Sequence, residues 1–457
     1  MVMDASLLSR IQFGMTVGFH FFFPPLSIGL AWLIAWLERR AWKRQDLEAA
    51  SFARLFGVVF AILYIVGIAT GLVMALQFGT NWAKFTTFVN AVFGPLLVAE
   101  VILAFFLESI FFGIWMFGGS RISARLRTWA ITLVAIGATI SAFWIVAADS
   151  WMQTPAGYVV DNGRAVLTDF WAAALNGSTL SRFAHVLSSA ASITGVFIAA
   201  IAAWLAIKGR KPEFTKLVLT VGIVVSLLGI ALSSATGVTE ALRLGSQQKE
   251  KVAVFRGLVD DAGNLIVAAV PAEPAPVEAA ATPASPEVPA SPAASASGDA
   301  VPVLAAPEVE AVAAATADVE TTAMPPVVPT KVTFGLMIVT GCMTALLYLI
   351  ALAGRLQGFL LKSKGLLWAL VWSIPLPIIA TQAGWFAAEI GRQPWIVYGQ
   401  LKTADALSPS VSGGEVLFSV ILLGLVYLVL LVLSIAMTRN SVRKAFTADD
   451  THAEVTK

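Results

Sequence analysis

Charge, cysteine and histidine are all scarce in this sequence, and each scarcity excludes a class of protein or site. Charged residues make up 13% of the 457 positions, about half their share in ordinary soluble domains, while 58% of positions are hydrophobic. This combination excludes a soluble enzyme with one or two ordinary cores, and the apolar content excludes a disordered chain. The single cysteine, Cys342, rules out an internal disulfide and argues against a thiolate-bound metal cluster. A net charge of +2 does not indicate a nucleic-acid partner.

Long apolar runs are what the sequence has in abundance. A helix that crosses a hydrocarbon core of roughly 30 Å needs about 20 mostly apolar residues. The runs lack the two-residue alternation of a membrane barrel, so helices are expected. Nine runs are long enough, at about 13–37, 52–76, 93–117, 127–148, 183–207, 215–236, 333–353, 365–388 and 415–437. The sequence therefore predicts an all-α integral membrane protein with nine transmembrane helices in a bundle.

The lysine and arginine residues in the connecting loops predict the orientation of this bundle. Cytoplasmic loops of membrane proteins carry an excess of these two residues. The basic groups follow spans one, three, five, seven and nine, at residues 39–44, 121–127, 208–216, 355–364 and 439–444. Because these groups fall on one side when there are nine spans, we expect the N-terminus outside and the C-terminus in the cytoplasm.

One long connection divides the predicted bundle into two unequal parts. Spans one to six occupy residues 1–236, spans seven to nine occupy 333–438, and a cytoplasmic tail occupies 439–457. The connection, 237–332, is expected on the outside. Its first part, Glu240 to Asp261, is charged and compatible with ordered structure. Its second part, about 267–330, consists almost entirely of Ala, Pro, Val, Glu, Ser and Thr, and is predicted to be disordered.

A few ionisable residues lie inside the predicted spans, where they are costly and usually functional. They are His20 in span one, Glu100 and Glu108 in span three, His185 in span five, and Glu389 with Arg392 at the end of span eight. In the predicted orientation these residues, apart from Glu108, share one layer with Met337 in the outer half of the bilayer. Glu108 lies eight residues beyond Glu100, about 12 Å deeper. We therefore expect sites near the outer face and a polar route towards the cytoplasm.

Histidine, methionine and carboxylate side chains in an apolar bundle suit haem iron, for which neutral imidazole and thioether are common axial ligands. Each residue also has a simpler interpretation. An intramembrane histidine often bonds a neighbouring helix, Met337 is one of 10 methionines that fill gaps, and Glu389 with Arg392 has the spacing of an ion pair. From the residues alone, a haem redox protein and a proton-coupled transporter are about equally supported.

A set of motifs in a fixed order narrows this choice. The motifs are LSRIQFGMTVGFHFFFPPL (8–26), QFGTNW (77–82), FGPLLVAEVILAFFLES (93–109), SAFWIVAADSWMQTP (141–155), RFAHV (182–186) and AGWFAAEIGRQPW (383–395). In these motifs the chain resembles subunit I of the cytochrome bd-type quinol oxidases over nearly all nine spans. The resemblance implies a terminal respiratory oxidase of the bacterial inner membrane. Such an enzyme oxidises quinol near the outer face and reduces dioxygen to water with protons taken from the cytoplasm.

The resemblance also implies a cofactor role for individual residues. His20 matches the axial ligand of the oxygen-reducing haem, which is haem d or a third haem b, and Glu100 matches an acid on or beside the same iron. His185 and Met337 match the axial pair of the low-spin haem b. Glu389 matches the ligand of the high-spin haem b.

Other residues match the surroundings of these haems. Arg392, Trp385 and Trp395 match residues that line the haem pockets, with Arg392 meeting a propionate. Glu108 and Ser109 match positions on the proton route.

The resemblance extends to substrates and partners. Lys251 matches a basic residue of an external loop that binds quinol. The implied partners are a second membrane subunit, subunit II, and a small single-span subunit, with lipid around the complex and no nucleic acid.

The quinol side departs from the family pattern, which leaves the electron donor open. Arg256 stands where a glutamate commonly follows Lys251 by five residues, and SSATG (233–237) replaces an acidic GDxSG-like segment. Asp149 replaces a common asparagine, and Gly335 a common arginine. One alternative is therefore a bd-like oxidase with a donor other than quinol. The other is the proton-coupled transporter, which predicts inverted repeats that the sequence does not show.

Overall fold

The computed structural model describes residues 4–210, 212–263 and 324–455. Within these ranges nine helical segments are long and apolar enough to cross a membrane, as the sequence predicts. These segments run Ala5–Arg44, Leu47–Thr80, Ala83–Phe117, Ala124–Gln153, Thr179–Ile207, Pro212–Gly245, Val327–Leu356, Lys364–Ile390 and Gly413–Arg443. Each begins before its apolar run, because capping side chains such as Asp46 and Ser123 start the helices among polar residues.

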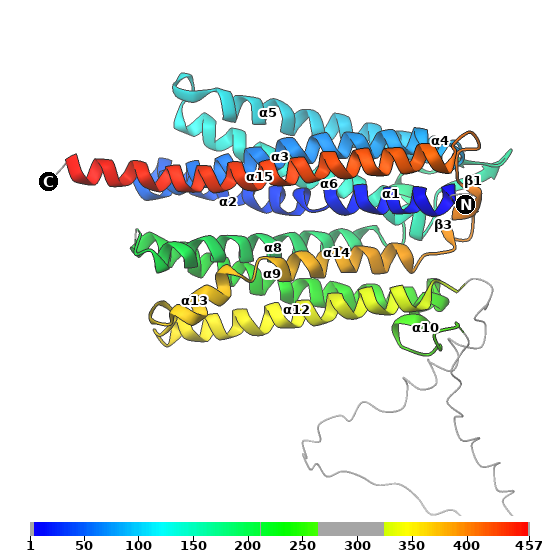
Figure 1. Cartoon of the computed structure of the whole chain (residues 1–457). Coiled ribbons are helices and arrows are strands. Elements are labelled where there is room, and N and C mark those ends of the chain that lie inside the picture. The colour runs from blue at the N-terminus through cyan, green and yellow to red at the C-terminus, as the bar shows by residue number, and fades with distance from the viewer. Residues whose placement is uncertain (1–3, 211, 264–323, 456–457) are drawn as a thin grey trace, which may run out of the picture.

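The helices lie side by side along one common direction, with the two chain ends at opposite ends of the bundle (Figure 1). The helices are α1 (Ala5–His20), α2 (Phe23–Arg44), α3 (Leu47–Thr80), α4 (Ala83–Glu100), α5 (Phe106–Phe117), α6 (Ala124–Gln153), α7 (Phe170–Ala174), α8 (Thr179–Ile207), α9 (Pro212–Gln247), α10 (Lys249–Phe255), α12 (Val327–Leu356), α13 (Lys364–Val371), α14 (Pro375–Ile390) and α15 (Gly413–Val455). In Figure 1, α8, α9, α12 and α14 form one side of the bundle, and α2, α3, α5, α6 and α15 form the other.

Two small antiparallel sheets lie in connections near the N-terminal end of the bundle (Figure 1). The strands are β1 (Tyr158–Asp161) with β2 (Arg164–Leu167), and β3 (Trp395–Val397) with β4 (Leu401–Lys402). Asn162 and Gly163 join β1 to β2 with φ angles of 46° and 72°. Two successive positive φ angles are what a two-residue hairpin requires, and Asn-Gly is its preferred sequence.

Proline residues place two breaks within the membrane-spanning segments. Proline has no backbone N–H and crowds the carbonyl four residues earlier. Pro24 stands four residues after His20, the last residue of α1, and Pro375 stands four residues after Val371, the last residue of α13. The break after α1 therefore frees the backbone beside His20 from the regular helical pattern.

A further irregularity lies between the two acidic residues of the third span. Residues Val101–Phe105 form a π-helical turn that joins α4 to α5. Such turns carry an extra residue and are frequent at functional sites. The turn changes the directions in which Glu100 and Glu108 project, so spacing on a regular helix does not describe their relation.

Close helix contacts hold the bundle together. A Cβ atom added at Gly222 would lie 2.6 Å from the backbone N of Ala199, and one at Gly229 would lie 2.4 Å from that of Ser192. Small residues therefore let α9 approach the backbone of α8, as in many membrane helix pairs. The buried core extends from this pair into α2, α3 and α6 through apolar side chains such as Phe56.

The long connection is ordered at both of its ends. Helix α9 continues to Gln247, past the predicted end of its span, and α10 packs through Val254 against Val327 at the start of α12. Residues 327–332 are helical, so the boundary predicted at 333 is too late by six positions. Helix α15 likewise continues through most of the predicted tail. Residues 264–323, which hold most of the segment expected to be disordered, lie outside the described residues, and that expectation stays a prediction.

Candidate functional site

His20 ends α1 and faces α3. Its Nδ1 atom lies 3.1 Å from the Thr70 hydroxyl, and a Cβ atom added at Gly71 would lie 3.1 Å from its Cε1. Helix α1 begins at Ala5, so His20 lies about 22 Å along it at 1.5 Å per residue. The predicted outer position of His20 stays a prediction. Its depth was counted from the apolar run, and the helix starts eight residues earlier.

His185 lies on α8 and faces α9 in the same manner. Its Nδ1 atom lies 3.1 Å from the Thr236 hydroxyl, and a Cβ atom added at Gly237 would lie 3.3 Å from its Cε1. Met337 of α12 is partly buried, and its sulfur would lie 2.8 Å from a Cβ atom at Gly384 of α14. Each of these candidate ligands therefore rests against a glycine of a neighbouring helix.

The two glutamates of the third span contact α6 at different heights. The Ser141 hydroxyl donates to Glu100 Oε1 at 2.6 Å. Glu108 is buried, and its Cβ lies 2.9 Å from the position that a Cβ at Gly137 would occupy. The Ser109 hydroxyl beside it is buried without a hydrogen-bond partner among the described residues. These groups form a polar row inside an otherwise apolar part of the bundle.

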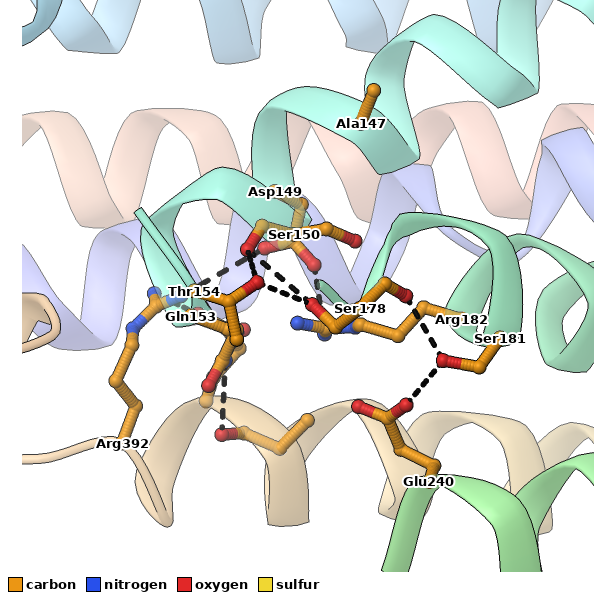
Figure 2. A network of polar contacts seen from close by, with 12 residues as sticks. Ala147, Asp149, Ser150, Gln153, Thr154, Ser178, Ser181, Arg182, Glu240 and Arg392 are labelled. Carbon is orange, nitrogen blue, oxygen red and sulfur yellow. Dashed lines mark hydrogen bonds and ion pairs between the residues drawn. The ribbon is translucent and has the colours of Figure 1, made fainter. Parts of the chain in front are cut away.

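A larger polar network joins α6, α8 and α14 near the N-terminal end of the bundle. Asp149 pairs with Arg182 at 2.8 Å and lies 3.9 Å from Arg392, so the carboxylate stands between two arginines (Figure 2). Arg392 also pairs with Glu389. The Ser181 hydroxyl donates to Glu240 of α9 at 2.6 Å (Figure 2). The prediction that Glu389 and Arg392 lie together is thus matched by their contact.

Spacing along α6 shows that this network is a separate layer. Ser141, which contacts Glu100, precedes Asp149, which contacts Arg392, by eight residues or about 12 Å of helix. The single layer expected from the sequence therefore does not hold for Glu100 and Arg392, whose contacts lie about 12 Å apart along α6. Helix α4 begins at Ala83, well before the apolar run at 93, so Glu100 lies deeper than its position in the run indicated.

Lys251 of α10 enters the network from the long connection. It is 3% exposed, and its ammonium donates to the Ala388 carbonyl at 2.9 Å and to the Gln248 side chain at 3.3 Å. Burial, together with the nearby positive charge of Arg182, lowers the pKa of Lys251 to about 7. Arg256, five residues later, is exposed. Lys251 and Arg256 therefore differ in burial.

The two candidate tryptophans differ in their surroundings. Trp385 is partly buried on α14 and packs edge-on against Phe386, with ring centroids 4.8 Å apart. Trp395 begins β3, beyond the end of α14, where the Lys402 ammonium lies 5.6 Å from its ring. Trp385 is thus inside the bundle and Trp395 in the connection that covers its end.

These side chains fit haem better than a directly bound metal ion. In the described part of the chain, no three His, Cys, Asp or Glu residues gather into a metal site. A haem needs only one or two protein ligands at its iron. In both histidines Nδ1 is engaged by a threonine, and Nε2 forms no hydrogen bond within the described ranges. The Nε and Nη1 atoms of buried Arg392 also lack hydrogen-bond partners there. Buried polar groups are normally hydrogen-bonded, so these N–H groups can bind an acidic group.

Some residues of the network were not among the predicted site residues. Arg182 is partly buried one turn before His185, and Gln153 donates to Glu389 Oε1 at 3.2 Å. Arg182 could have been predicted from the sequence, because an arginine beside a histidine at the start of a span is costly. Gln153 and Glu240 could not, because uncharged or loop-side polar residues are common at helix ends.

Known proteins share this chain's sequence over nearly its whole length. A family model described as cytochrome bd terminal oxidase subunit I matches residues 8–446. The chain is 34% identical over 466 residues to cytochrome bd ubiquinol oxidase subunit 1 of Bacillus subtilis (strain 168), covering 98% of this chain and 96% of that protein. It is 29% identical over 501 residues to cytochrome bd-II ubiquinol oxidase subunit 1 of Escherichia coli (strain K12), covering 96% of each.

A solved structure shares the fold. The bd oxidase from Geobacillus thermodenitrificans matches with a TM-score of 0.79 and 24% identity, covering 96% of this chain and 99% of that chain. The predicted class, a multi-pass membrane oxidoreductase, is confirmed, and the transporter interpretation is excluded by the family. The fold, the nine spans and the match along nearly the whole chain show that it belongs to the cytochrome bd terminal oxidase subunit I family.

Proposed function

We propose that the chain is the haem-bearing subunit of an oxidase that oxidises quinol near the outer face of a bacterial inner membrane and reduces dioxygen to water. The observation that carries this proposal is the pair of intramembrane histidines whose Nδ1 atoms each lie 3.1 Å from a threonine hydroxyl, while no hydrogen bond involves Nε2 among the described residues. The lysine and arginine distribution supports an outer N-terminus and a cytoplasmic C-terminus.

The chain's own residues would hold three haems. His20, with Glu100 nearby, is assigned to the oxygen-reducing haem, which is haem d or a third haem b. His185 with Met337 is assigned to the low-spin haem b, and Glu389 to the high-spin haem b. When bound, haem supplies the one-electron redox chemistry and the dioxygen site.

Haem propionates and flat haem faces need their own surroundings. Arg392 is 4% exposed and has unused N–H groups, which suits it to pair with a propionate. Trp385 and Trp395 offer apolar faces for the pockets. Asp149 and Glu389 limit the net positive charge that Arg392 and its neighbour Arg182 place there.

Protons for water formation come from the cytoplasm in this proposal. Glu108 is buried and Ser109 offers an unpaired hydroxyl next to it, so both suit a route that holds and passes protons. Glu100, bonded to Ser141, lies further along the same side of α6. The acids therefore line the path between the cytoplasmic end of the bundle and the deep histidine.

Quinol is the proposed donor, because the relatives from Bacillus subtilis and Escherichia coli are named ubiquinol oxidases. Lys251 and its partners in the long connection are the proposed quinol side. Its ammonium already has protein acceptors, and Arg256 is exposed, so a donor other than quinol is the second candidate. Both relatives are named subunit 1, which supports a subunit II partner; we propose a small single-span subunit as well.

Oxygen uptake by the purified complex tests the donor. A reduced short-chain ubiquinol or menaquinol should sustain uptake, and a quinol-site inhibitor should stop it. Uptake with a reduced phenylenediamine but with neither quinol would favour the second candidate. Absence of uptake with every donor, from a complex that contains haem, would contradict the oxidase proposal.

A further inference from the structure

The tripeptide Ala-Thr-Gly occurs twice in the sequence, at 69–71 in α3 and at 235–237 in α9. Each copy lies against one of the two histidines proposed as haem ligands. The threonine hydroxyl oxygen is 3.1 Å from the histidine Nδ1 atom in both cases. The second copy is part of SSATG, which departs from the pattern expected of the family. The same local arrangement thus occurs on two different helix pairs.

The direction of the hydrogen bond follows from the other contacts of each threonine. A hydroxyl has one proton to donate, and a backbone carbonyl can only accept. The Thr70 hydroxyl lies 2.8 Å from the Val66 carbonyl, and the Thr236 hydroxyl lies 2.8 Å from the Leu232 carbonyl, four residues earlier in each helix. Each hydroxyl donates its proton there and presents a lone pair to the histidine. The histidine Nδ1 atom must therefore carry the proton.

The glycine of each segment provides the space in which the ring lies. A Cβ atom at Gly71 would approach His20 Cε1 to 3.1 Å, and one at Gly237 would approach His185 Cε1 to 3.3 Å. These distances are tighter than ordinary contacts, so a side chain there would displace the ring. In each case the threonine contacts Nδ1, and the glycine leaves room for the ring at Cε1.

We propose that the two Ala-Thr-Gly segments are positioning elements for the histidine ligands, in which Thr70 and Thr236 fix the Nδ1–H form so that Nε2 faces the haem iron. This inference rests on the proposed function. A hydrogen bond from Nδ1–H makes the imidazole a better donor to a metal and sets its orientation. Its loss should therefore weaken binding of one haem and raise that haem's midpoint potential, since the oxidised iron loses more stabilisation.

The test uses the whole complex with Thr70→Val and Thr236→Val, which keep the shape of threonine and remove the hydroxyl. Thr70→Ser and Thr236→Ser are the matched controls. Haem transfer to added apomyoglobin and a spectroelectrochemical titration are measured for each variant. Thr70→Val should release the His20 haem about 10–100-fold more readily, and Thr236→Val the His185 haem, each with an upward shift in that haem's potential. The serine variants should match the wild type.

Each outcome is decisive. If both valine variants keep wild-type potentials and haem retention, or if each changes both haems equally while serine changes them too, the inference is wrong. If a valine variant loses both haems, rescue by serine supports the inference and failure of serine overturns it. If the wild type carries no haem, or if His20→Ala and His185→Ala leave every haem in place, the proposed function itself fails, and the inference with it.

Discussion

Asp149 and Arg182 form an ion pair of 2.8 Å between Oδ2 and Nη2, which joins the end of α6 to the start of α8. The same carboxylate lies 3.9 Å from Nη1 of Arg392, beyond the end of α14. One acid therefore links α6 and α8 to the residues after α14, and it compensates the partly buried Arg182 and the buried Arg392. Removing a partner from such a network leaves charge uncompensated in a medium that solvates it poorly.

Substitution of Asp149 should show how much its negative charge stabilises the protein by compensating the two arginines. Asp149→Asn keeps an oxygen that accepts from Arg182 but removes the negative charge, so we expect the free energy of unfolding to fall by about 1–3 kcal/mol. Thermal unfolding in detergent measures the change. Asp161→Asn, at an exposed strand position, is the control. Equal midpoints for wild type and Asp149→Asn would show that the carboxylate does not stabilise this junction.

The two histidine environments should be separable by spectroscopy. His185→Ala or Met337→Leu should remove the low-spin haem b signal and leave the oxygen-reducing haem, because only the first haem loses an axial ligand. His20→Ala should do the reverse. Reduced-minus-oxidised visible spectra record both signals. Met337→His, which supplies another axial ligand, should retain a low-spin signal; a loss there equal to that of Met337→Leu would count against an axial position for residue 337.

Glu108 should affect proton delivery without affecting the haems. Glu108→Gln removes the proton-carrying group from a buried position and should lower oxygen uptake by about 100-fold, while the haem spectrum stays unchanged. Oxygen electrode rates, normalised to haem content, measure the effect. Glu213→Gln replaces an exposed glutamate and should have no effect. A normal rate in Glu108→Gln would remove this residue from the route.

Lys251 should make stability depend on pH. Its pKa falls from 10.5 to about 7 on folding, so the proton is bound less tightly in the folded protein than in the unfolded one. The lowered pKa of Lys251 therefore destabilises the folded protein. This destabilisation is absent above pH 10.5, grows as the pH falls towards 7, and is constant below 7. Lys251→Met removes it. The variant's stability relative to wild type should therefore rise as the pH falls from 9 to 7.

Unfolding midpoints between pH 6 and pH 9 test this dependence. Lys216→Met, at a more exposed lysine, is the control and should show no such trend. Parallel curves for wild type and Lys251→Met would mean that Lys251 keeps an ordinary pKa in the folded protein.

The sequence predicted the spans well because the length of an apolar run can be read directly from hydropathy, and a helix needs a run of that length to cross a bilayer. It predicted the relative levels of the candidate residues less well. Glu100 was placed in one layer with Arg392 from the edge of an apolar run, whereas α4 begins 10 residues before that run. The contacts of Glu100 and Arg392 lie about 12 Å apart along α6.

Contacts between distant segments could not be predicted in this way. The pairing of Asp149 with Arg182 and the burial of Lys251 depend on how α6, α8, α10 and α14 pack. The π-helical turn after Glu100 also has no recognised sequence signal, because an inserted residue in a helix changes neither composition nor hydropathy. The repeated Ala-Thr-Gly segments were visible, but only the structure shows that both face a histidine.

The most direct test of the central claim is a reduced-minus-oxidised visible spectrum of the purified complex, combined with haem extraction and quantification. A haem-bearing oxidase subunit should give a low-spin haem b signal together with high-spin haem b and either haem d or a further haem b signal, at three haems per complex. A folded, colourless complex from which no haem can be extracted would contradict the assignment of His20, His185, Met337 and Glu389 as haem ligands.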